Sequence, residues 1–270
     1  MSRLWMRFAW LLCLPLAAHA GNDCREQPLP PAKVAAAAET ALRAAAALDQ
    51  MDASVALIAR VGTDLSRQGL VYSHAGFVLR DHPQGRWTVV HLLNECGSDR
   101  SGLYAQGLVN FFSDDLVNQD LRIVWFKPDV AQRLTARLQQ MPRHGLHHPH
   151  YNLIARPGSR DYQNSTAWLI EIMASAIADR PIYDRVTAYA FARDDGFAPD
   201  TIHVPYTKRV LGGLFTANVD FTDHPVATRL SGDYPVVTVR SIFRYLDSAG
   251  YTERVLEWRN GRPMTVPGPA

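Results

Sequence analysis

Two histidines, His74 and His91, have the type and spacing that acid–base or hydrogen-bonding chemistry requires. They lie within Leu70–Asn94, where two strand-like runs flank a cluster of turn-forming residues. The start of the first strand and the end of the second meet in an antiparallel hairpin, so we expect the two imidazoles to adjoin. Gly76 leaves room beside the first imidazole. The alternative is that both histidines simply fill a half-buried sheet.

A third candidate, Ser165, lies at the predicted start of a helix. In the stretch Tyr151–Ala178, apolar residues from Trp168 onwards recur at helical spacing, and Asn164 or Ser165 is placed to cap that helix. A hydroxyl at this position sees the positive end of the helix dipole and free backbone N–H groups, which could stabilise an anion formed during attack on a carbonyl. The alternative is an ordinary capping serine with no other role.

The first twenty residues predict an export signal. Two arginines precede a short apolar run, and Ala18-His19-Ala20 matches the small-x-small pattern before a cleavage point, so we expect the mature chain to begin at Gly21. The run is too short to span a bilayer, and no later stretch is long and apolar enough. We therefore expect a periplasmic or secreted protein without a transmembrane segment in the mature chain.

Export would leave two cysteines, Cys24 and Cys96. In an oxidising compartment two remaining cysteines tend to pair, so we expect a disulfide between them. The chain-entropy model gives such a bridge roughly 2–5 kcal/mol of stabilisation. The alternative makes Cys96 a nucleophile beside His91.

Composition limits the classes of protein and ligand that fit this sequence. The chain has 270 residues, 47% of them hydrophobic, and a net charge of +2, so one large domain fits and no basic face indicates nucleic acid. The histidine-rich stretch 144–150 raises the question of zinc, but its spacing fits no established motif and its proline and glycine indicate a loop. We therefore expect no metal and no cofactor.

The motifs around these residues carry a resemblance to known families. The His-x-Gly strand, the second histidine one strand later and the helix opening "QNST" resemble circularly permuted papain-like enzymes of the NlpC and lecithin retinol acyltransferase types. That resemblance implies that His74 is the base, that His91 orients it and that Ser165 stands where these enzymes have cysteine. The phrases "YSHAGFVLRDHP", "VVHLLNECG", "SGLYAQGLVNFF" and "YQNSTAW" resemble an exported bacterial family known as domain of unknown function 2145.

Together these observations predict an α+β fold in which an antiparallel sheet packs with helices. We expect a papain-like core over residues 21–185 and a C-terminal extension, residues 186–270, packed on it. The functional hypothesis is an amide or ester hydrolase or acyltransferase of the cell envelope, acting on a peptide, cell-wall or lipid ligand; the alternative is an inactive binding or scaffolding module on the same fold. Supporting roles near the three candidate residues are expected for Tyr72, Asn94, Glu95, Asn164 and Tyr151.

Overall fold

A computed structural model describes residues 28–114, 116–140, 146–209 and 217–264. The helices are α1 (Pro31–Leu48), α2 (Leu108–Phe112), α3 (Pro128–Gln139), α4 (Ser165–Ile177), α5 (Arg185–Asp194), α7 (Val226–Ser231) and α8 (Val239–Ser248), with 3-10 turns η1 (Ser66–Gln68) and η2 (Phe221–Asp223). The strands are β1 (Val55–Arg60), β2 (His74–His82), β3 (Gly85–Asn94), β4 (Ser101–Gly107), β5 (Leu121–Phe126), β6 (Asp200–His203), β7 (Asp233–Val236), β8 (Thr252–Arg259) and β9 (Arg262–Met264).

Seven of these strands form one sheet in the order β4-β3-β2-β1-β5-β8-β9, and each neighbouring pair with a described register is antiparallel. The predicted α+β class with an antiparallel sheet is therefore confirmed. The stretch 186–270 was expected as an extension packed on a core, but its strands β8 and β9 complete the sheet beside β5. A boundary near residue 185 consequently does not divide the sheet from the rest of the chain.

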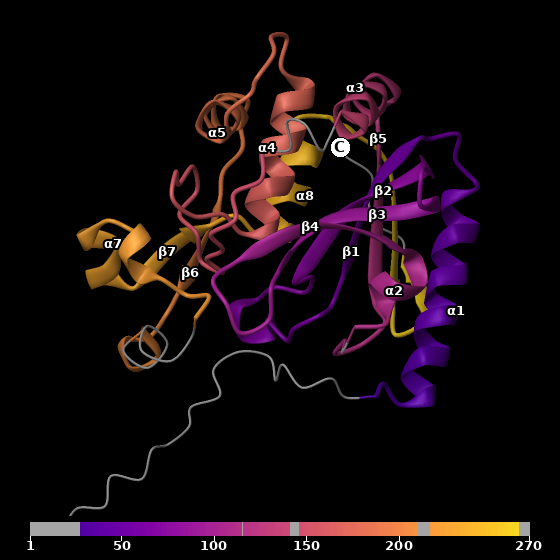
Figure 1. The fold of residues 1–270 in the computed structure, drawn as a ribbon, viewed down its shortest axis with the longest axis horizontal. Coiled ribbons are helices and arrows are strands. Elements are labelled where there is room, and N and C mark those ends of the chain that lie inside the picture. Colours follow the sequence, from indigo (N-terminus) through magenta and orange to yellow (C-terminus); the bar gives the residue numbers. More distant parts are fainter. Residues whose placement is uncertain (1–27, 115, 141–145, 210–216, 265–270) are drawn as a thin grey trace, which may run out of the picture.

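Helices cover both faces of the sheet, and each face has its own hydrophobic core. On one face the small side chains of α1, with α2, pack over Ile58, Val78, Val89 and Trp125. On the other face α3, α4, α5 and α8 pack over Phe77. Figure 1 shows α1 on one side of the sheet and α4 and α8 on the other. Strand β1 is buried along its whole length because both of its faces are covered.

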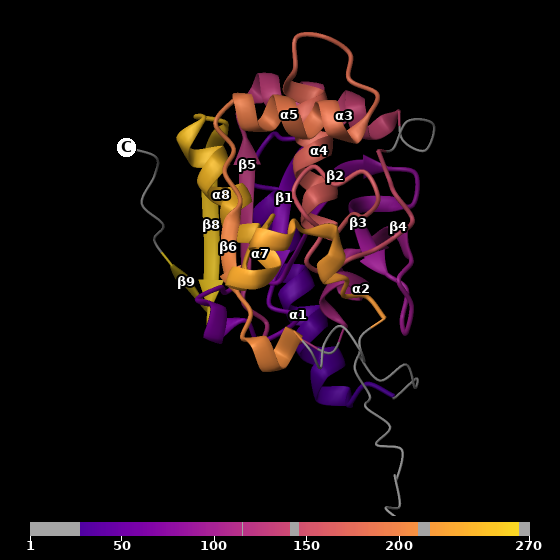
Figure 2. The ribbon, with the colours of Figure 1, turned by 90° about the vertical axis from the view of Figure 1, so that its left-hand side faces the viewer.

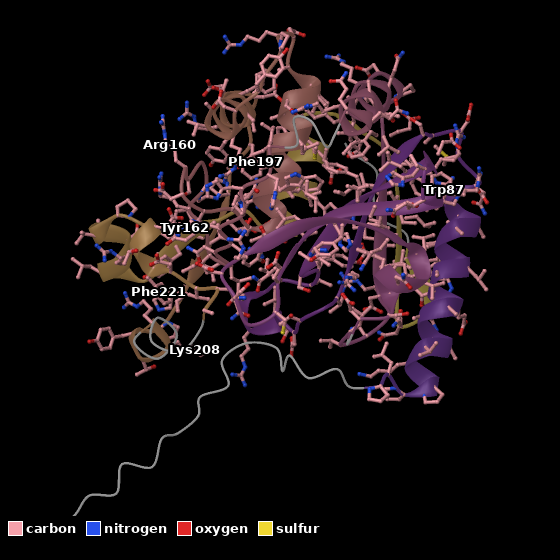
Figure 3. All side chains as sticks on the ribbon, viewed as in Figure 1. Trp87, Arg160, Tyr162, Phe197, Lys208 and Phe221 are labelled. Carbon is pink, nitrogen blue, oxygen red and sulfur yellow. The ribbon has the colours of Figure 1, made fainter. Side chains whose placement is uncertain are left out.

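The alanine-rich helix α1 follows from its sequence. Proline at its first position suits a helix start, and the buried Ala37, Ala41 and Ala44 let its backbone lie close to the sheet. Just after its end, the Asp49 carboxylate accepts a hydrogen bond of 2.7 Å from the Trp87 indole, which lies beside α1 (Figure 3). This contact ties the helix to the turn of the β2–β3 hairpin.

The small sheet β6–β7 lies apart from the large one and is joined to α8 by a buried carboxylate. Asp200 is held at 2.9 Å by Arg240 and at 2.8 Å by Arg244, and it also accepts the hydroxyl of the α8 cap Thr238. Two arginines and a hydroxyl satisfy this carboxylate, as burial of a charge demands. Within the described residues, no helix combines the length and the apolar composition needed to cross a membrane.

Candidate functional site

The two histidines of the hairpin meet as the sequence predicts. His74 opens β2, His91 lies in β3, and the His74 Nε2 atom is 2.8 Å from the His91 Nδ1 atom. Gly76 makes this approach feasible: a Cβ added there would lie 2.6 Å from a Val89 methyl carbon and 3.0 Å from the His91 Cβ. A side chain at position 76 would therefore press first on Val89 and then on the Cβ atom of His91.

A third side chain extends this pair into a chain of hydrogen bonds across three strands. The His91 Nε2 atom lies 3.1 Å from the Gln106 Oε1 atom on β4. An amide oxygen only accepts, so His91 carries its proton on Nε2, and its bare Nδ1 accepts a hydrogen bond from His74 Nε2–H. We call the chain His74–His91–Gln106 the relay. In this arrangement the Nδ1 atom of His74 carries no proton, and it has no hydrogen-bond partner within the described part of the chain.

A buried arginine lies against the relay. Arg60 ends β1 directly opposite His74, is 4% exposed, and lies with its guanidinium 4.7 Å from the centre of the Phe111 ring. Its nitrogens donate to the Phe111 carbonyl and to the Asp114 carboxylate. The short helix α2 thus anchors a fixed positive charge beneath the imidazoles.

Burial and this charge keep both imidazoles neutral. Loss of solvation is the largest cause and holds the pKa of His74 well below its usual range, with the neighbouring His91 and Arg60 adding to the effect. The pKa of His91 falls to about 4, again chiefly because of burial and next because of Arg60. A general base works best with a pKa near the operating pH, so the relay is a weak proton acceptor and a good hydrogen-bond acceptor.

Ser165 does not lie beside the two histidines. It opens α4, where Asn164 caps the helix by accepting a 2.7 Å hydrogen bond from the Ala167 N–H, so of the two predicted caps Asn164 takes this role. Helix α4 packs on the sheet through Trp168, whose ring centroid lies 5.7 Å from that of Phe77. Side chains alternate along a strand, so Phe77 and His74, three residues apart on β2, point to opposite faces. The predicted convergence of Ser165 with the relay is therefore wrong: the sheet lies between them.

The Ser165 hydroxyl has a structural partner instead. The side chain is 9% exposed and shares a hydrogen bond with the Tyr151 hydroxyl. Burial raises the pKa of that phenol to about 12, so it stays neutral. The neutral phenol is not a base that could take a proton from the serine at neutral pH.

The other residues expected to support the site take up roles in turns and in the core. Tyr72 packs edge-on against Phe243 with ring centroids 5.9 Å apart, on the α4 and α8 side of the sheet. Asn94 donates from its amide to the Ser98 and Arg100 carbonyls at 2.9 and 2.7 Å, and the backbone of Glu95 closes the same turn. These contacts match the turn chemistry expected for such residues in a loop.

The described residues of the histidine-rich stretch, 146–150, make contacts within the chain. His147 Nε2 lies 3.1 Å from the Ser101 hydroxyl, and the rings of His148 and His150 meet edge-on. The described residues contain no group of three or more His, Cys, Asp or Glu side chains placed to hold a metal ion. Cys24 and the predicted signal, residues 1–20, lie outside the described residues. Cys96 lies in the turn beyond β3, five residues after His91 and past the strand end.

Sequence reasoning missed two residues that contact or adjoin the histidine pair. Gln106 and Arg60 were not singled out, although both carried a signal. An arginine closing the apolar run "VALIA" is unusual in a buried strand and asks for a partner. In the same way, the alternation of "SGLYAQG" would have placed Gln106 on one face of an edge strand.

One protein family matches this chain. Residues 47–246 match the family described as "Uncharacterized protein conserved in bacteria (DUF2145)". The match runs from the end of α1 to α8 and includes the whole relay. No curated protein and no solved structure shows a significant match.

Proposed function

The chain belongs to this bacterial family, and we propose that it is a binding module of the cell envelope rather than a serine hydrolase. The observation that carries the proposal is the placement of Ser165 and the relay on opposite faces of the sheet. A nucleophilic serine needs its base within hydrogen-bond reach. The placement in the envelope follows from the predicted signal alone.

The surroundings of the histidines support the same proposal. No serine or threonine hydroxyl among the described residues forms a hydrogen bond with His74 or His91. The papain-like resemblance requires a nucleophile and a histidine in contact, so it does not carry its activity over to this arrangement. The relay offers a ligand one neutral acceptor nitrogen, on the half-buried His74. Such an acceptor suits an uncharged donor, such as a peptide amide or a hydroxyl.

Acyl-probe labelling tests the proposal. The variant Ser165→Cys, with Cys24 and Cys96 replaced by serine, should react with a thiol-directed acyl probe no faster than a free cysteine peptide. The reason is that His74 and His91 lie across the sheet from position 165 and cannot lower the pKa of the new thiol. Adding His74→Ala should leave the rate unchanged.

The native protein provides the matching measurement. A serine-directed fluorophosphonate should not modify Ser165, and Ser165→Ala should show the same background labelling as the wild type. Labelling of Ser165, or a Ser165→Cys rate above that of the free peptide that falls on adding His74→Ala, would overturn the proposal and restore the hydrolase.

A further inference from the structure

Strand β4 is one of the two outer strands of the large sheet (Figure 2), and among the described residues its outer edge is paired at one end only. Its inner edge pairs with β3 from Ser101 to Gly107. On its outer side, Arg100 forms an antiparallel bridge with His150, with hydrogen bonds from the Ser101 N–H to the Pro149 carbonyl and from the Tyr151 N–H to the Asp99 carbonyl. A short piece of this chain therefore already lies in the position of an added strand.

Proline ends that pairing after one step. The next bond of an antiparallel ladder would run from the N–H of residue 149 to the Ser101 carbonyl, and Pro149 has no N–H. The chain then turns away, and the Ser101 hydroxyl contacts the His147 imidazole and the His148 carbonyl instead. Residues 146–148, the described part of the segment before Pro149, thus add no backbone pairing along β4.

The rest of the edge presents unpaired backbone groups. Backbone direction alternates along a strand, and the Ser101 N–H points outward, so the N–H and C=O groups of Leu103 and Ala105 point outward too. These groups have no hydrogen-bond partner among the described residues. Residues 102–107 also contain no charge and no proline, the two features with which proteins usually block an exposed edge.

A second copy of this chain fits the edge less well than a free peptide. In the register that pairs Leu103–Gly107 of two copies about a two-fold axis, the start of α2 of one copy, at Leu108, would lie opposite Gly102 of the other. Pro149 and His150 of that other copy already occupy the adjoining place on its edge. A free peptide, without a helix at the end of its strand, has no such clash.

We propose that the β4 edge from Leu103 to Gly107 binds an extended, uncharged peptide by strand addition. The free edge accommodates about five residues. Leu103 and Ala105 pack towards the core on the α4 side, which favours small apolar side chains on that face of the peptide. Tyr104, 40% exposed, and Gln106 lie on the relay side, which favours aromatic or hydrogen-bonding side chains there. The inference deepens the proposed binding function and rests on it.

Amide hydrogen exchange in the full mature chain tests the edge directly. The probe is an acetylated, amidated heptapeptide of alternating threonine and valine. In the free protein the amides of Leu103 and Ala105 should exchange fast, and saturating peptide should slow both at least tenfold. The same peptide N-methylated on every residue keeps its side chains but has no N–H group to donate to β4, and it should not protect these amides.

A pair of variants isolates the backbone group. Ala105→Pro removes an N–H that points away from β3, so the sheet should keep its own ladder while peptide affinity falls at least tenfold. Ala105→Ser keeps the N–H and should bind within twofold of the wild type. An unchanged thermal unfolding temperature in both variants shows that the fold is retained.

Three results would overturn the inference. The first is no protection of the two amides at millimolar peptide. The second is equal peptide affinity in Ala105→Pro and Ala105→Ser. The third is slow exchange without peptide. Slow exchange that depends on protein concentration would mean that a second copy covers the edge, and slow exchange at every concentration would mean that this chain covers its own edge. None of these results involves Ser165, so the acyl-labelling experiment tests the proposed function independently.

Discussion

The buried imidazole of His91 should make the protein less stable as the pH falls below neutrality. Its pKa in the folded protein is about 4, whereas an unfolded histidine titrates near 6.5. Between these values the unfolded chain binds a proton that the folded chain does not. The contribution of His91 to the free energy of unfolding is therefore complete above about pH 6.5 and is lost as the pH falls towards 4. The difference between the two pKa values corresponds to about 3 kcal/mol.

The variant His91→Asn separates this contribution from those of other groups. Asparagine can place an acceptor oxygen where His91 Nδ1 receives its hydrogen bond from His74, and it does not titrate. At pH 7 we expect the variant to be less stable than the wild type, since it loses buried ring contacts and the bond to Gln106. As the pH is lowered to 4, this stability gap should shrink by about 3 kcal/mol.

Urea unfolding of both proteins in steps from pH 7.5 to pH 4.0 measures the gap, and NMR of the imidazole carbons measures the pKa of His91 itself. A gap that stays constant within about 0.5 kcal/mol across this range, or an imidazole that titrates near 6.5, would refute the argument. Either result would mean that water reaches His91 and that the relay is not closed.

Three further outcomes are expected, two from this geometry and one from the sequence. Gly76→Ala should lower the free energy of unfolding by about 1–3 kcal/mol through overpacking. The control Gly107→Ala, whose new Cβ would meet nothing within 4 Å, should stay within about 0.5 kcal/mol of the wild type. Equal unfolding midpoints of the two variants would contradict this prediction. Gln106→Glu should raise the pKa of the buried imidazole it contacts above about 4, because a carboxylate favours the charged ring; an NMR titration without a rise would exclude that contact. Peptide mapping of the unreduced exported protein should recover Cys24 and Cys96 in one linked fragment, and two free thiols would disprove the bridge.

Local patterns were sufficient to predict the hairpin and the meeting of its histidines. Alternation, turn formers and antiparallel geometry fix which residues of a hairpin adjoin, and all three act over about 25 residues. The alanine-rich run of α1 and the β-branched residues of β5 likewise favour these elements locally. What these patterns have in common is that each element is determined within its own segment.

The face on which α4 packs could not be predicted in the same way. The sequence predicts the helix and a cap at Asn164 or Ser165. Both faces of the central strands are apolar, however, so alternation along β1 and β2 does not indicate which face receives which helix. That choice depends on how large side chains such as Trp168 and Phe77 fit together across the core. The order of histidines and helix that resembles papain-like enzymes is compatible with packing of α4 on either face. Only packing on the face of the histidines would bring Ser165 within their reach.

The relay is connected to the free edge through strand β4. His74, His91 and Gln106 lie on three successive strands, so their hydrogen bonds run across the sheet and end on β4. This adds a side-chain connection to the backbone ladder on the inner side of an edge strand whose outer side is unpaired. An edge that is to receive a peptide must keep its own register while backbone groups on the other side change partners. A buried, neutral chain of hydrogen bonds suits that task because it does not change charge near neutral pH. We therefore interpret the histidine pair as a support for a binding strand, which explains why it needs neither a nucleophile nor a pKa near 7.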